Sequence, residues 1–250
     1  MAAAESIWAR GSNVEWCEAV AQPFRHSPHV AEFWNTISNA AFLVIGAVGL
    51  IRAWKSSWAI LYTEAMLLVV GVGSCLFHSR RTWVGEVLDE LPMSAMALGY
   101  LMCLDGRHVA ESRRVRWGAY LAVFALTGSA WVLYLAFHQY EVFTTLFTLQ
   151  VLVPALLSLR ADRDRLGGVF SSSRGLWWAF FFTIILGKGL WELERYLHRR
   201  GACPRETSDP RFWLHPLWHL LSATAHGFWM RYANMLSEEG SPAKKGLKAA

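Results

Sequence analysis

The stretch GVGSCLFHSRRTWVGEVLDELPM, residues 71–93, decides how this chain folds. An apolar run ends in Ser74 and His78, a short basic turn follows, and a second apolar run begins with acidic residues that include Asp89. Because Ser74 and His78 are four residues apart, they share one face if the first run is helical. The stretch therefore predicts a helical hairpin that brings a hydroxyl, an imidazole and a carboxylate together at one end.

A second pair of histidines, His215 and His219, repeats the spacing of four residues. Three imidazoles beside a free carboxylate match a catalytic zinc site, which has three nitrogen ligands, an open position for water and a nearby base. We therefore predict that His78, His215 and His219 bind zinc and that Asp89 is the base. The alternative is a set of hydrogen-bonded core histidines, but ionisable groups inside a membrane are costly and usually functional.

The composition is that of a membrane protein, since 54% of the 250 residues are hydrophobic and 17% are charged, against about 25% charged in soluble domains. A spanning helix needs about 20 apolar residues. We expect an all-α, seven-transmembrane helix bundle over residues 33–232, after a polar N-terminal segment (1–32) that covers the site and before a disordered tail (233–250). The predicted spans lie near 33–52, 58–79, 84–104, 117–137, 142–160, 175–194 and 211–232.

The basic residues predict how the chain sits in its membrane. The net charge of +5 comes from short loops and the tail between apolar runs, so it does not indicate a nucleic-acid partner. Seven spans put the two termini on opposite sides, and Lys and Arg are more frequent on the C-terminal side. By the positive-inside rule that side is cytosolic, which leaves the N-terminal side lumenal.

The four cysteines do not form a CxxC pair, so a thiolate zinc site is not expected. Cys75 and Cys103 fall in apolar runs and read as small core residues. Cys17 and Cys203 fall in polar segments on the predicted lumenal side, which is oxidising enough for disulfides. They form a candidate disulfide that would hold the N-terminal segment over the metal site, with two unpaired thiols as the alternative.

Acidic residues occur in two further groups. Glu15, Glu18 and Glu32 lie in the N-terminal segment, where they are either solvated charge or oxygen ligands of calcium, with backbone carbonyls completing the shell. Glu86 and Glu90 flank Asp89 and are expected to be solvated charge at the start of the third span.

Five motifs together resemble the alkaline ceramidase family, which is similar to a wider group of seven-span membrane hydrolases that includes the adiponectin and progestin receptors. These motifs are Glu15-Trp-Cys-Glu18, Ala31-Glu-Phe-Trp-Asn-Thr-Ile-Ser-Asn39, Gly73-Ser-Cys-Leu-Phe-His78, Leu88-Asp-Glu-Leu-Pro92 and His215-Pro-Leu-Trp-His219. The resemblance implies an enzyme of the endoplasmic reticulum or Golgi membrane that hydrolyses ceramide to a sphingoid base and a fatty acid.

The resemblance also implies a role for particular residues. The family's zinc ligands map onto His78, His215 and His219, and its catalytic serine and aspartate map onto Ser74 and Asp89. Its calcium site maps onto Glu15, the backbone of Trp16, Glu18 and Glu32. At two positions the chain departs from the family, which usually has Asp in place of Glu15 and often Asn in place of Val20.

Two other functions use the same kind of fold. One is a non-enzymatic receptor for a lipid ligand, and the other is a transporter or proton-conducting protein with Lys188, Glu192 and Asp89 as its polar path. A hydroxyl and a carboxylate beside the predicted zinc favour the hydrolase, because a purely structural metal site needs neither an open position nor a base.

Overall fold

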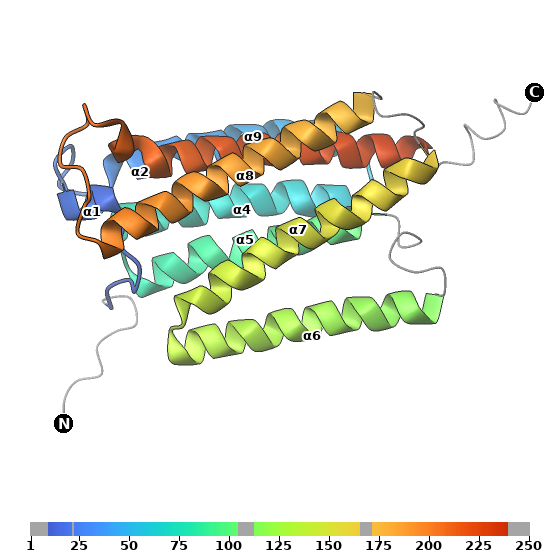
Figure 1. The fold of residues 1–250 in the computed structure, drawn as a ribbon, viewed down its shortest axis with the longest axis horizontal. Helices are drawn as coiled ribbons and strands as arrows, with labels where there is room; N and C mark the ends of the chain where they lie inside the picture. The colour runs from blue at the N-terminus through green and yellow to red at the C-terminus, as the bar shows by residue number, and fades with distance from the viewer. Residues whose placement is uncertain (1–9, 22, 105–112, 166–171, 240–250) are drawn as a thin grey trace, which may run out of the picture.

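The computed structural model describes residues 10–21, 23–104, 113–165 and 172–239, and these residues form helices joined by loops (Figure 1). The predicted all-α class is confirmed. In order, the elements are α1 (Cys17–Ala21), α2 (Phe33–Ser38), α3 (Ala40–Ala53), α4 (Trp58–Arg80), α5 (Trp83–Cys103), α6 (Arg113–Phe137), α7 (Tyr140–Arg165), α8 (Ser172–Arg199), the 3₁₀ helix η2 (Pro210–Trp213) and α9 (Leu214–Glu239).

The long helices run side by side along the longest axis of the molecule (Figure 1). Helix α4 packs between α3 and α5, and α8 packs along α9. Helix α6 lies at the edge of the bundle, where it packs mainly against α7. The short helices α1 and α2, the α4–α5 turn and the α8–α9 connection all gather at one end of the bundle (Figure 1).

Five of the described helical segments are long and apolar enough to cross a membrane, namely Phe33–Ala53, Trp58–Arg80, Trp117–Phe137, Tyr140–Leu159 and Ser173–Arg199. Their outer faces carry exposed apolar side chains such as Ile51, Leu121 and Phe182, as expected of helices whose solvent is lipid. Helices α5 and α9 match the remaining two predicted spans in position. Their crossing of the membrane, and hence the count of seven, stays a prediction.

The C-terminal boundary lies further along the chain than the sequence suggests. Helix α9 continues to Glu239, so the tail predicted to begin at residue 233 begins inside a helix. Residues 240–250 of that tail, and residues 1–9 of the N-terminal segment, lie outside the described residues.

The turn between α4 and α5 is tight because each helix end is capped. Arg81 ends α4 in the left-handed conformation (φ 53°), and its N–H donates to the carbonyl of Phe77. Thr82 is the N-cap of α5, and its hydroxyl accepts the N–H of Gly85 at 3.1 Å. These caps satisfy backbone groups that a helix end leaves free, and they place His78 and Asp89 at the same end of the bundle.

Gly73 sets how closely α4 and α5 approach. A Cβ atom at this position would lie 1.8 Å from the carbonyl oxygen of Leu88. The backbones of α4 and α5 therefore touch at Gly73 and Leu88. Ser74 and Asp89 are the next residue on each helix. This contact brings the predicted catalytic hydroxyl and carboxylate together.

The close approach makes Gly73→Ala destabilising, because the added methyl group meets a backbone atom that cannot rotate away. We expect a loss of about 1–3 kcal/mol in the free energy of unfolding, the usual cost of overpacking, seen as a lower Tm in detergent. The control is Gly128→Ala on α6, where a Cβ atom meets nothing within 4 Å. An equal effect of both variants would contradict the role of Gly73.

Candidate metal centre

The three predicted ligand histidines meet at the crowded end of the bundle. His78 lies in the last turn of α4, and His215 and His219 lie in the first two turns of α9. All three are buried, and their ligand nitrogens lie within 4.8 Å of one another. The structure therefore brings together side chains that are more than a hundred residues apart in the sequence.

Each imidazole directs its Nδ1 atom towards a protein partner. His78 Nδ1 lies 2.5 Å from Glu32 Oε2, and His219 Nδ1 lies 2.8 Å from Ser38 Oγ. His215 Nδ1 lies 3.2 Å from Glu194 Oε2. Hydrogen-bonded partners of this kind fix the tautomer and orientation of metal-binding histidines, as Glu32 does for His78 and Ser38 for His219.

The donor set fits a zinc ion. His78 Nε2 is buried and has no hydrogen-bond partner among the described residues, and an unpaired buried polar atom costs about 1–3 kcal/mol. A metal bound by His78 Nε2 together with the other two imidazoles would remove that cost. Three nitrogen ligands with room for a fourth are the pattern of catalytic zinc.

Ser74 and Asp89 lie beside the histidines, as the sequence predicts. They line the same small cavity as His215 and His219. The Ser74 hydroxyl is buried next to the Asp89 carboxylate and has no well-aligned hydrogen-bond partner among the described residues. The cavity therefore offers a carboxylate and a hydroxyl beside two of the three imidazoles.

The N-terminal segment covers this centre. The ring of Trp16 packs on His215 with 4.0 Å between the ring centroids, and the N–H of Cys17 donates to Glu194 Oε1 at 2.9 Å. Cys17 forms a disulfide with Cys203, which lies in the connection between α8 and α9. The disulfide thereby ties the N-terminal segment to the α8–α9 connection beside the three histidines.

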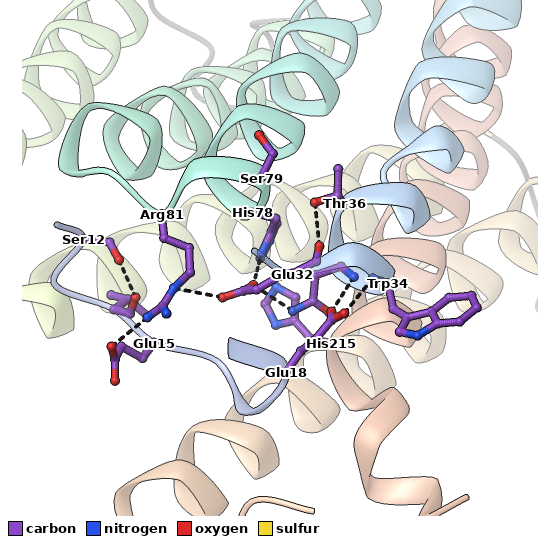
Figure 2. Close-up of polar contacts among 12 residues, drawn as sticks. Ser12, Glu15, Glu18, Glu32, Trp34, Thr36, His78, Ser79, Arg81 and His215 are labelled. Carbon is purple, nitrogen blue, oxygen red and sulfur yellow. Dashed lines mark hydrogen bonds and ion pairs between the residues drawn. The ribbon is translucent and has the colours of Figure 1, made fainter. Parts of the chain in front are cut away.

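Glu18 holds α2 in place. Its two carboxylate oxygens accept the N–H groups of Trp34 and Asn35 at 2.8 Å each (Figure 2). These are first-turn amides that have no partner within the helix, and a negative charge suits that end of the helix dipole. Burial raises the pKa of Glu18, against the opposing effect of the two hydrogen bonds.

The expectation that Glu86 and Glu90 are solvated is wrong, because both side chains are buried. Glu86 accepts the hydroxyl of Tyr134 on α6 at 2.7 Å and the N–H of Asn13 at 2.6 Å. The N-terminal segment and α6 cover the start of α5 and supply these donors.

Sequence reasoning missed Ser38 and Glu194, whose side chains lie against the Nδ1 atoms of two of the histidines. The signal for Glu194 was an acidic residue at the end of an apolar span, where ionisable groups are usually functional. The signal for Ser38 was weaker, because a serine in such a run also reads as a small packing residue.

The fold and the site define a helical, membrane-type protein with a buried cluster of three histidines that could bind a metal. A protein-family model described as "Ceramidase" matches residues 9–247, and the chain belongs to that family of ceramide-hydrolysing enzymes. The chain is 25% identical to alkaline ceramidase 3 of Mus musculus over 84% of this chain and 78% of the relative. It is 20% identical to the putative alkaline ceramidase dcd3A of Dictyostelium discoideum over 88% of this chain and 85% of the relative.

If the histidines bind zinc, His219→Ala should yield a folded protein that has lost most of its metal, because two nitrogens hold zinc much more weakly than three. Metal analysis of the purified protein measures this. His29→Ala, a change at an exposed histidine, should leave the zinc content unchanged. Full zinc occupancy in His219→Ala would remove this residue from the site.

The disulfide gives a separate prediction. Mass spectrometry of non-reduced peptides should find the Cys17 peptide joined to the Cys203 peptide, and Cys203→Ser should lower the free energy of unfolding by about 2–4 kcal/mol. Cys75, which is free, serves as the control thiol. Alkylation of both Cys17 and Cys203 without a reductant would contradict the pairing.

Proposed function

We propose that this chain is a zinc-dependent enzyme that cleaves the amide bond of ceramide within the membrane, giving a sphingoid base and a fatty acid. The observation that carries this proposal is a buried cluster of three imidazoles, two of which line one cavity with Asp89 and Ser74. Membership of the ceramidase family supports the choice of substrate.

The proposed ligands His78, His215 and His219 would hold the zinc. When bound, zinc supplies a Lewis acid that polarises the amide carbonyl and makes water a stronger nucleophile. Asp89 would take one proton from the attacking water and later give it to the leaving nitrogen. A C–O bond forms, the C–N bond breaks, and the products are a carboxylic acid and an amine.

Ser74 supplies a hydroxyl at the reacting carbon. Because this hydroxyl lies beside Asp89 in the cavity that His215 and His219 line, it would be able to donate to the carbonyl oxygen as negative charge develops there. Stabilisation of that kind acts most strongly in a buried site with few waters. The buried surroundings of Ser74 therefore support a role in oxyanion stabilisation.

The bundle offers space for a hydrocarbon chain. An apolar cavity of about 690 Å³ lies between α5, α6 and α7, within the usual range of about 300–1,000 Å³ for ligand sites. Its lining includes Leu101, Leu126, Leu146 and Leu149. We propose that one chain of the ceramide occupies this cavity.

The predicted location follows from the same features. The apolar helices support a multi-pass membrane protein. A Cys17–Cys203 disulfide needs an oxidising compartment, which supports a lumenal position for the N-terminal side. We propose the endoplasmic reticulum or Golgi membrane. Between the hydrolase and the receptor or ion-conducting alternatives, family membership and the open metal site favour the hydrolase.

The test separates metal binding from chemistry. Asp89→Asn should keep its zinc but lose turnover by about 10²–10⁴-fold, because the variant has no general base. Ceramide hydrolysis and metal content are measured on the same preparation. Glu206→Gln, a change at an exposed carboxylate, is the control. Near-normal hydrolysis by Asp89→Asn would remove Asp89 from the mechanism.

A further inference from the structure

One guanidinium group lies between two carboxylates of the N-terminal region. Arg81 Nη2 lies 2.7 Å from Glu15 Oε1, and Arg81 Nε lies 3.3 Å from Glu32 Oε1 (Figure 2). The side chain of Glu32 is fully buried, whereas that of Glu15 is 50% exposed. Arg81 therefore joins a glutamate near the surface to one inside the metal centre.

The residues expected to bind calcium do not fit that ion here. Calcium takes about 6–8 oxygen ligands, but Glu15 and Glu32 share the Arg81 cation and Glu18 accepts two backbone N–H groups. The carbonyl of Trp16 accepts the N–H groups of Ala19 and Val20. A calcium ion would also meet the fixed positive charge of the guanidinium.

We propose that Arg81 takes the place of a bound cation, so that this ceramidase works without calcium. Its guanidinium pairs with both Glu15 and Glu32 and holds the N-terminal segment on the end of α4. For the activity measurement, this inference rests on the proposed ceramide hydrolysis.

The backbone of Arg81 supports the same arrangement. Its carbonyl accepts the N–H of Ser12 at 2.9 Å, and an isolated β-bridge joins Gly11 to Thr82. Arg81 itself adopts φ 53°, a conformation that costs a residue other than glycine about 1–2 kcal/mol. Glycine would adopt this backbone conformation without strain. The two ion pairs of the Arg81 side chain offset the conformational cost that arginine has here.

Arg81 acts on the metal centre through Glu32. Arg81 contacts Glu32 Oε1, while Glu32 Oε2 lies against His78 Nδ1 and accepts the side-chain N–H of Asn35 at 2.9 Å. The guanidinium and the amide thus fix the carboxylate that orients a zinc ligand. Arg81 is a positioning residue, since Glu32 lies between it and the imidazole.

Calcium binding by the zinc-loaded wild-type protein is the first test. Equilibrium dialysis with radioactive calcium, at constant free zinc, should show no stoichiometric binding up to millimolar calcium. Ceramide hydrolysis should be unchanged when free calcium is lowered to nanomolar levels with a calcium buffer. One bound calcium per protein, or a loss of hydrolysis at low calcium, would overturn the proposal.

Variants of Arg81 test whether its positive charge supports zinc binding and replaces calcium. Arg81→Gln should bind zinc about 10-fold more weakly, as is usual when an outer-shell partner is lost, and its hydrolysis should rise with millimolar calcium. Arg81→Lys should recover part of the zinc affinity, because it keeps the charge. Arg80→Gln, a change at the exposed neighbouring arginine, should match wild type. Unchanged zinc affinity in Arg81→Gln would contradict the positioning role.

The binding measurements keep this inference separate from the proposed function. Zinc and calcium binding need no substrate, so they decide the role of Arg81 even if ceramide is not cleaved. Absence of ceramide turnover in zinc-loaded wild-type protein at every calcium concentration would count against the proposed function alone. If Arg81→Gln does not fold, calcium binding by the wild-type protein still decides the inference.

Discussion

The structure depends on one constraint, which is that each buried imidazole must have one nitrogen fixed by the protein if the other is to face a metal. Glu32 and Ser38 from the α2 region hydrogen-bond to two of the imidazoles, and Glu194 from α8 lies 3.2 Å from the third. The N-terminal segment, α2, α4, α8 and α9 must therefore converge at one end of the bundle. Glu18 and the backbone of Cys17 serve that convergence, since they tie the N-terminal segment to α2 and to Glu194.

Much of this arrangement follows from the sequence. The spacing of Ser74 and His78, and of His215 and His219, predicts shared helix faces, and the structure has these residues in α4 and α9. The apolar runs predict the long helices, and the boundaries differ most at the C-terminal ends of α7, α8 and α9, which continue to Arg165, Arg199 and Glu239. Local patterns succeed here because helical periodicity and apolar length depend on neighbouring residues alone.

Other features depend on contacts between distant segments, which a local pattern does not contain. Glu86 reads as a surface charge until Tyr134 and Asn13, from two other parts of the chain, cover it and donate to it. Arg81 reads as part of a basic turn, and only the folded chain places it against Glu15 and Glu32. In both cases the sequence shows a charged residue, but its burial and its bonding partners come from distant segments that only the folded chain brings together.

The placement of the histidines also bears on how the protein is made. A ribosome completes α4 with His78 long before it reaches α9, which carries the other two imidazoles. Cys17 likewise precedes Cys203 by 186 positions in the chain. The early helices must therefore enter the membrane with His78 and Glu32 still lacking their later neighbours. The cluster of three histidines is complete only after the first turns of α9 have been synthesised, so a chain that ends before α9 lacks it.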